Sequence, residues 1–242
     1  MGFLTRLFSK PPVEISAGVY QLSAVGSTVT AIVEDQGVVL VDAGGRGSAP
    51  VIAAGLEAVG SSMDRVNLVV LTHHHPDHTG GLAAVIEMSS ATVAAHRLEA
   101  PIINGNAKMP DPHQNKLFAT VVRPMVAAMS GPSASVDHEL DDGEFLPIGD
   151  DIRVVHTPGH TPGSICLLLT SCGVLIVGDA LQYRSGRLSP PAAMVTQDAA
   201  QALDSIGKMA GLEFDTVAFG HFPPLRDNAR ETVRRLAGGA SG

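Results

Sequence analysis

The first part of the chain alternates short apolar segments with turn residues. Such segments run over 19–22, 29–33 and 38–41, and four polar or glycine residues at 34–37 separate the last two. Short apolar runs divided by turn residues are typical of β-strands joined as hairpins. The pattern therefore predicts three strands in this part, with the second and third forming a hairpin.

Helical and strand patterns alternate over the next fifty residues. Apolar residues at helical spacing predict a helix over 48–59, and a β-branched run over 66–71 predicts a buried strand. A second helix is expected to begin near Thr79, whose hydroxyl would cap its N-terminus. A further strand is expected over 92–95.

The segment 101–135 has a different texture, because five prolines interrupt it. We expect it to be partly helical and partly loop. Its methionines and phenylalanine, among them Met109 and Met129, could form an apolar lid over a site or belong to the core. Its conformation would then decide the substrate.

Strand patterning returns after residue 150 and is followed by further helices. The predicted strands cover 151–156, 164–169, 174–177 and 216–219, and the predicted helices cover 197–209 and 227–236. Two β-rich halves with helices predict an α+β protein of the αββα type, in which two packed mixed β-sheets are flanked by helices. We expect an N-terminal extension at 1–12 and a single domain over 13–242, with a lid insertion at about 101–135.

The composition limits the partners and the cellular compartment that we expect for this protein. With 45% hydrophobic and 17% charged residues the chain can bury a large core, and its net charge of -8 makes nucleic acid an unfavourable partner. Neither a signal peptide nor a membrane-spanning run is found, so we expect a cytoplasmic protein with no membrane partner. Cys166 and Cys172 flank a predicted turn. They could pair across it, but idle thiols are expected in a reducing compartment.

The run 72–81 carries the strongest chemical signal. His73 and His75 are two residues apart, so their side chains lie on the same side of an extended backbone and can bind one metal ion. Asp77 and His78 follow at the start of the predicted helix. A solvated run of histidines is the alternative, but a buried strand before the run and a helix after it favour a metal site.

Three later residues have similar settings. His160, Asp179 and His221 each follow a predicted strand and have Gly or Pro neighbours. Loops at the ends of strands can converge on one site, and glycine permits close approach of the backbone. Any one of the three alone would more often be structural.

Together these residues resemble the pattern of the metallo-β-lactamase superfamily, over a region from Val19 to about Leu225. The motif H-x-H-x-D-H with a distant His, Asp and His is met by His73, His75, Asp77, His78, His160, Asp179 and His221. The similarity implies that His73, His75 and His160 bind a first metal. It implies that Asp77, His78 and His221 bind a second, that Asp179 bridges both, and that Asp42 supports the metal-binding loops.

The resemblance also implies the metallo-β-lactamase fold and a dinuclear hydrolytic site. Two divalent ions, zinc first and iron, manganese or cobalt as alternatives, would lower the pKa of a shared water. Metal-bound hydroxide would then attack a carbonyl carbon while Asp77 orients it and moves its proton. Tyr183 could donate a hydrogen bond to the substrate oxygen, or it could serve in packing.

Departures from better-known relatives indicate the substrate. Asp179 argues against a dedicated β-lactamase, and His75 stands where the diiron flavoprotein branch has Glu. Only 21 residues follow His221, too few for the glutathione-binding helical domain of glyoxalase II. We therefore expect a small-molecule ester or lactone, such as an acyl-homoserine lactone, with a thioester next.

Two rival functions and one assembly remain open. One rival is a mononuclear iron persulfide dioxygenase, which retains much of the same motif. The other is a binding protein whose site has lost its activity, and the complete ligand set argues against it. A homodimer follows from the resemblance alone.

The remaining histidines are expected outside the site. His74 should turn away from the metals, and His156 should be a hydrogen-bonded structural residue. Surface or packing roles are expected for His96, His113 and His138.

Overall fold

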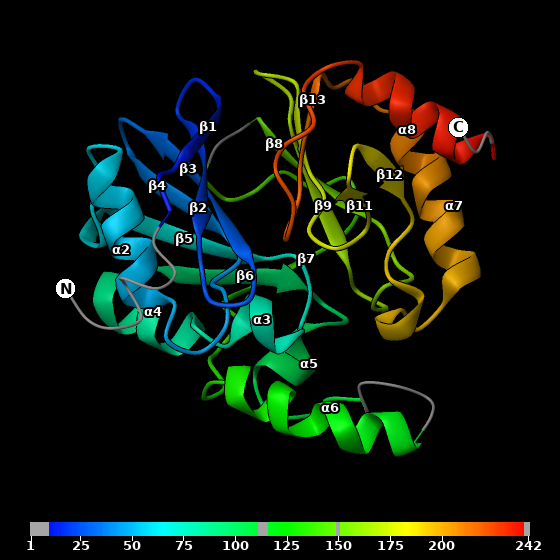
Figure 1. The fold of residues 1–242 in the computed structure, drawn as a ribbon. Helices are drawn as coiled ribbons and strands as arrows, with labels where there is room; N and C mark the ends of the chain where they lie inside the picture. The colour runs from blue at the N-terminus through cyan, green and yellow to red at the C-terminus, as the bar shows by residue number, and fades with distance from the viewer. Residues whose placement is uncertain (1–9, 111–115, 149–150, 240–242) are drawn as a thin grey trace. The chain divides into compact units, whose positions relative to one another are not determined.

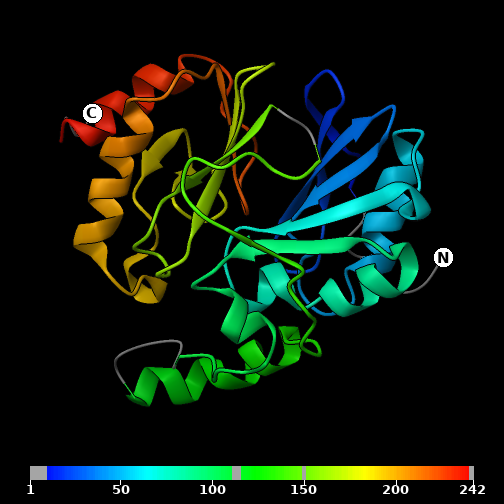
Figure 2. The ribbon, with the colours of Figure 1, turned by 180° about the vertical axis from the view of Figure 1, so that it is seen from behind.

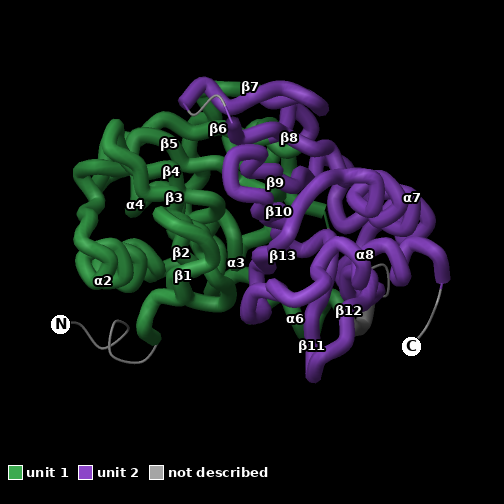
Figure 3. Tube along the Cα trace, turned by 90° about the horizontal axis from the view of Figure 1, so that it is seen from above, with its two compact units in different colours: residues 1–95, 99–139 green, residues 96–98, 140–242 purple. Residues whose placement is uncertain are grey.

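The computed structural model describes residues 10–110, 116–148 and 151–239. These residues divide into two compact units, shown in different colours in Figure 3. Unit 1 comprises 1–95 and 99–139, and unit 2 comprises 96–98 and 140–242. His113 and most of the predicted N-terminal extension lie outside the described residues.

A mixed β-sheet forms the centre of unit 1. Its strands follow the order β1-β2-β3-β4-β5-β6-β7, and the last residues of β6 and β7 are assigned to unit 2. The strands are β1 (Val13–Ser16), β2 (Val19–Ser23), β3 (Thr28–Glu34), β4 (Gly37–Val41), β5 (Val66–Leu71), β6 (Thr92–His96) and β7 (His138–Leu140). β1 to β4 are antiparallel, whereas β4, β5 and β6 are parallel. Five of these strands were predicted, and the short β1 and β7 were not.

The helical segments of unit 1 are α2 (Ala49–Ala58), the 3-10 turn η1 (Met63–Arg65), α3 (Pro76–Thr79), α4 (Leu82–Ser89), α5 (Ala100–Ile103) and α6 (Lys116–Met129). Of these, α2 and α4 pack against the sheet. In Figures 1 and 2, α2 and α4 lie side by side along the sheet. Ile52 and Leu56 of α2 and Leu82 of α4 are buried in one apolar cluster with the strand residues Leu40 and Val69. This burial holds the sheet, and with it the loop that follows β5, in place.

The predicted start of the second helix at Thr79 is wrong. The first helical turn, α3, begins at Pro76 with His75 as N-cap, and α4 begins separately at Leu82. Proline suits the first helical position because its φ is already helical and its missing N–H is not needed there. Thr79 therefore caps nothing, and its hydroxyl donates to the carbonyls of His74 and His75 at 3.3 and 3.2 Å.

Unit 2 contains a second, smaller mixed sheet. Its strand order is β13-β10-β9-β8, and a separate two-stranded ribbon pairs β11 with β12. The strands are β8 (Ile152–His156), β9 (Ile165–Leu169), β10 (Val174–Ile176), β11 (Gln182–Arg184), β12 (Arg187–Ser189) and β13 (Thr216–Ala218). β8, β9 and β10 are antiparallel, and β10 and β13 are parallel. The four strands of this sheet were predicted from the sequence.

Two long helices pack beside this sheet. The helical segments of unit 2 are η2 (Ala193–Val195), α7 (Ala199–Ala210) and α8 (Ala229–Ala237), and α7 and α8 lie next to each other in Figures 1 and 2. Ile206 and Met209 of α7 and Val233 of α8 share a buried cluster with Leu175 and Val217. The predicted α+β class is therefore confirmed in both units. Among the described helices, none has the length and apolar character needed to cross a bilayer.

Both cysteines are free thiols, as predicted. Cys166 lies on β9 and is fully buried, and Cys172 lies in the turn after that strand. Burial raises the pKa of the Cys166 thiol to about 12. Cys166 is therefore a packing residue rather than a nucleophile.

Candidate metal centre

The loop between β5 and α3 carries the first half of the predicted ligand set, all within unit 1. β5 is buried from Leu68 to Leu71 and delivers the chain to His73. The Nε2 atom of His73 lies 3.1 Å from the Nδ1 atom of His75. Two nitrogens bound to one tetrahedral zinc at about 2.0–2.1 Å would be about 3.3 Å apart. The two imidazoles therefore already have the separation that one metal ion requires.

Asp42, at the end of β4, holds both ends of this loop. Its carboxylate accepts hydrogen bonds from the Thr72 backbone N–H at 2.8 Å and from the Thr72 hydroxyl at 2.9 Å. It also pairs with the His78 Nδ1 atom at 2.8 Å. When Nδ1 donates to a carboxylate, Nε2 is the nitrogen left for a metal. The supporting role that the resemblance implied for Asp42 agrees with these contacts.

Asp42 occupies an uncommon backbone conformation. Its φ angle is +69°, in the left-handed region, and the residue is only 2% exposed. Non-glycine residues adopt this region at some cost in free energy and are concentrated at functional sites. The strain is offset here by the hydrogen bonds that the carboxylate accepts.

Asp77 and His78 follow on α3 and differ in exposure. The Asp77 side chain is 21% exposed, whereas His78 is fully buried, and their Oδ2 and Nε2 atoms are 3.8 Å apart. The Ser27 hydroxyl donates to the Asp77 carbonyl at 2.6 Å and so anchors the turn to the residue just before β3. The buried imidazole of His78 is suited to bind a metal ion. The partly exposed carboxylate of Asp77 can also meet solvent or substrate.

His74 turns to a different partner. Its Nδ1 atom pairs with the carboxylate of Glu99, which also accepts the His74 backbone N–H at 2.8 Å. Both side chains are fully buried. The His74 ring lies edge-on to the His75 ring, with centroids 5.2 Å apart, and its Nδ1 atom is taken up by Glu99. That His74 turns away from the metals stays a prediction. Glu99 carries no signal in the sequence, because its partner lies 25 residues away and no local spacing links them.

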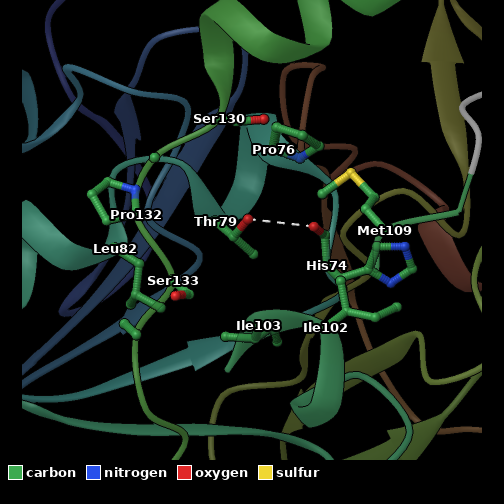
Figure 4. A pocket seen from close by; sticks show the side chains of 12 residues that line it. His74, Pro76, Thr79, Leu82, Ile102, Ile103, Met109, Ser130, Pro132 and Ser133 are labelled. Atoms are coloured by element: carbon green, nitrogen blue, oxygen red, sulfur yellow. Dashed lines mark hydrogen bonds between the residues drawn. The ribbon is translucent and has the colours of Figure 1, made fainter. Parts of the chain in front are cut away.

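A cavity of about 100 Å³ lies beside this loop within unit 1. His74, Pro76 and Thr79 of the loop line it together with Ile102 and Ile103 of α5 (Figure 4). The remaining lining residues are Leu82, Met109, Ser130, Gly131, Pro132, Ser133 and Ala134. The segment predicted as a lid, 101–135, thus supplies much of the wall, and most of that wall is apolar.

Unit 2 carries the other half of the predicted ligand set. His160 follows β8, Asp179 follows β10 and His221 follows β13. The Asp179 Oδ2 atom lies 3.7 Å from His160 Nε2 and 3.3 Å from His221 Nε2. The structure therefore brings these three residues together, although they are far apart in the sequence.

Glycines allow the loops of unit 2 to converge. Gly178 has a φ of +50°, and its carbonyl accepts the Gly220 N–H at 2.9 Å, which joins the loops after the parallel strands β10 and β13. Gly159 has a φ of +133°, and a Cβ there would collide with Ala202 of α7. Both loops thus depend on conformations that glycine adopts readily.

His160 is oriented by a residue that sequence reasoning missed. Its Nδ1 atom lies 3.4 Å from the Thr196 hydroxyl, and its carbonyl accepts the Gln197 N–H at 3.2 Å. The contact on Nδ1 leaves Nε2 directed towards Asp179. Thr196 carries no motif signal, since only the fold of the segment before α7 brings it to His160.

Tyr183 packs on Phe219 in unit 2. The two rings are stacked with centroids 5.8 Å apart, and Tyr183 is partly buried against the unit's core cluster. This contact supports the packing role that was one of the two expectations. Its role as a hydrogen-bond donor to substrate stays a prediction.

The other histidines among the described residues have structural roles or are exposed. His96 is buried and stacks on His156 at 4.1 Å, and His156 Nε2 pairs with the Pro162 carbonyl at 2.9 Å. The packing role of His96 and the hydrogen-bonded role of His156 are confirmed. His138, on β7, is exposed.

The chain matches a known protein family over most of its length. A family model described as "Metallo-beta-lactamase superfamily" matches residues 22–221. The chain belongs to the metallo-beta-lactamase superfamily. The predicted metallo-beta-lactamase fold is thereby confirmed. All seven predicted ligands are among the described His and Asp side chains that could hold a metal ion.

Individual members of the superfamily resemble the chain over most of its length. "Probable metallo-hydrolase YflN" of Bacillus subtilis (strain 168) is 30% identical over 97% of this chain and 95% of its own. A "Hydroxyacylglutathione hydrolase" of Chelativorans sp. (strain BNC1) is 26% identical over 75% of this chain, which spans 58% of that protein. A metallo-beta-lactamase family protein from Thermus thermophilus has a TM-score of 0.71 at 26% identity, covering 93% of this chain and 80% of its own. These likenesses support a metal-dependent hydrolase.

Proposed function

We propose that the protein is a dinuclear metal-dependent hydrolase that cleaves a carboxylic ester or a lactone, of the acyl-homoserine lactone kind. The observation that carries the proposal is the position of Asp179. Its Oδ2 atom lies 3.7 Å from His160 Nε2 and 3.3 Å from His221 Nε2. The superfamily pattern gives these two histidines to different metals, so the carboxylate between them is suited to bridge the pair.

The donor atoms fit divalent ions. Imidazole nitrogens and carboxylate oxygens are the ligands that zinc takes in hydrolytic sites, and iron, manganese and cobalt accept the same set. His73, His75 and His160 would hold one ion, and Asp77, His78 and His221 the other. A pair of bound ions supplies a deprotonated water near neutral pH and polarises the substrate carbonyl.

The chain's own groups have distinct tasks in this reaction. Asp77, whose side chain is partly exposed, would orient the attacking oxygen and receive its proton. Asp42 keeps the His78 imidazole in the tautomer that presents Nε2. Tyr183 would donate a hydrogen bond to the substrate oxygen as negative charge develops.

A thioester is the second candidate substrate. It is favoured by the relative named hydroxyacylglutathione hydrolase, which matches three quarters of this chain. Esters and lactones come first because the chain has few lysines that would attract an anionic glutathione conjugate.

A substrate panel with defined metal content tests the proposal. Protein loaded with zinc, manganese or iron would be assayed on acyl-homoserine lactones, simple esters, thioesters and phosphodiesters, with metal per chain from elemental analysis. We expect two ions per chain and turnover of lactones or esters. One iron per chain with oxygen uptake on glutathione persulfide would replace this proposal by a persulfide dioxygenase.

Replacing the bridging carboxylate should remove metal as well as activity. Asp179→Ala is expected to lose at least one ion per chain and to lower kcat/KM by more than about 100-fold, because a lost ligand costs more than a lost supporting contact. Asp204→Ala, at an exposed position on α7, is the matched control. Retained metal and turnover in Asp179→Ala would refute this site.

A further inference from the structure

Two buried carboxylates contact the metal-binding loop of unit 1. Asp42 holds Thr72 and His78, at the two ends of the loop. Glu99, the residue before α5, contacts its middle at His74. The superfamily pattern accounts for the first carboxylate but assigns nothing to the second.

We propose that Glu99 is a positioning residue, which holds His73 and His75 at the separation that a metal ion needs by fixing the backbone of His74 between them. Glu99 touches neither metal nor substrate in this role. The inference rests on one part of the proposed function, that this loop binds metal, and it does not depend on the substrate.

The contacts at His74 leave its backbone little freedom. One carboxylate oxygen, Oε2 of Glu99, accepts the His74 N–H at 2.8 Å and also pairs with its ring. The Thr79 hydroxyl donates to the His74 carbonyl at 3.3 Å. The residue between the two predicted ligands is therefore bonded through its N–H, its ring and its carbonyl.

Burial makes these contacts hard to replace. The side chains of His74 and Glu99 are 1% and 0% exposed, so removal of either partner leaves a buried polar group unpaired, which costs free energy. Charge-assisted hydrogen bonds are also stronger than neutral ones. Glu99 is itself fixed, because its carbonyl accepts the N–H groups of Ile102 and Ile103 in the first turn of α5, at 3.0 and 3.1 Å.

Fixing the backbone of His74 also fixes the positions of His73 and His75, the predicted ligands on either side of it. The His73 and His75 nitrogens are 3.1 Å apart, and both rings extend from peptide units that adjoin His74. A residue that orients metal ligands typically contributes about 10–100-fold to metal affinity. Because Glu99 acts through the backbone and not on a ligand ring, we expect about 10-fold, the lower end of that range.

The test compares three variants of the full-length chain. Glu99→Ala removes the carboxylate, and Glu99→Gln keeps one oxygen that can accept both N–H groups. Ile103→Ala is the matched control, because it removes a buried apolar side chain from the same short helix but leaves the carboxylate. Zinc dissociation constants from chelator competition and the visible spectrum of the cobalt-loaded protein would be measured without substrate.

We expect Glu99→Ala to bind zinc about 10-fold more weakly and to shift the cobalt spectrum, and Glu99→Gln to recover most of both. Ile103→Ala should lower the melting temperature and leave metal affinity and spectrum unchanged. Wild-type affinity and spectrum in Glu99→Ala, or an equal loss in Ile103→Ala, would overturn the inference. A wild-type chain that binds zinc but hydrolyses no ester overturns the proposed function alone, since this test uses no substrate.

Discussion

Residue type and spacing do not by themselves decide the role of a histidine in the run 73–78. His73 and His75 present nitrogens 3.1 Å apart, as alternation along an extended backbone predicts. His74 has the same side chain but lies between them, and it is bound to a buried glutamate. Adjacent residues of one type thus have different surroundings: two of them present nitrogens to each other, and the third supports the loop.

His74→Ala should separate these two roles. We expect it to keep its metal, because no ligand is lost and the backbone N–H still reaches Glu99. We also expect the free energy of unfolding to fall by about 3 kcal/mol, because the buried carboxylate loses its imidazole partner. Urea unfolding and elemental analysis would measure the two effects. His138→Ala, at an exposed position on β7, should change neither, and loss of metal in His74→Ala would contradict the division of roles.

At the scale of elements, ionic contacts supplement the apolar packing of the helices. Lys208, in the last turn of α7, donates to the Asp142 carboxylate at 2.7 Å and to the His156 carbonyl at 2.9 Å. The His156 N–H also donates to Asp142 at 2.8 Å. Burial raises the pKa of Asp142, but Lys208 and the His156 N–H outweigh it, so the pKa lies below its usual range. These contacts connect the end of α7 to the first residues after β7.

The stabilisation by this contact should depend on pH. A carboxyl group with a lowered pKa in the folded state contributes stability above its unfolded pKa of about 3.9, and the contribution is lost as the pH falls through the folded value. Lys208→Ala should therefore lower the melting temperature at pH 7, by no more than about 3 °C because the pair is half exposed. The difference from wild type should shrink below about pH 4. Lys108→Ala, another exposed lysine, is the control, and a difference independent of pH would contradict the argument.

At the scale of the whole molecule, each unit has its own sheet and its own apolar cluster. Of the predicted ligands, those of the motif at 73–78 belong to unit 1, and His160, Asp179 and His221 belong to unit 2. A ligand that binds only the folded chain stabilises it by mass action. Bound metal should therefore raise the melting temperature of the whole protein.

Chelation measures this contribution. At a metal concentration about 100 times the dissociation constant the expected stabilisation is about 2.7 kcal/mol, so EDTA should lower the melting temperature by roughly 5–10 °C. Added zinc should restore it. Asp179→Ala should show a smaller shift, and an unchanged melting temperature in the wild-type chain would indicate that metal makes no contribution to stability.

The sequence by itself determined the classes of element and the chemistry of the loops. Apolar periodicity predicted the strand over 66–71 and the helix over 48–59, because burial of one face imposes a period on the sequence. It also predicted the shared side of His73 and His75, since alternation along an extended backbone is a local property. The resemblance added the remaining ligands and Asp42.

Only the tertiary structure decided the contacts between distant segments. Glu99 reaches His74, Thr196 reaches His160, and His96 stacks on His156, yet none of these pairs has a local spacing that marks it. The split between α3 and α4 at Gly80 and Gly81 was also missed, because a Cβ at these positions would collide with the carbonyls of Met129 and Ala43, which are distant in the sequence. Such contacts depend on where whole strands and helices pack, and that is set by the summed burial of many side chains rather than by any short stretch of sequence.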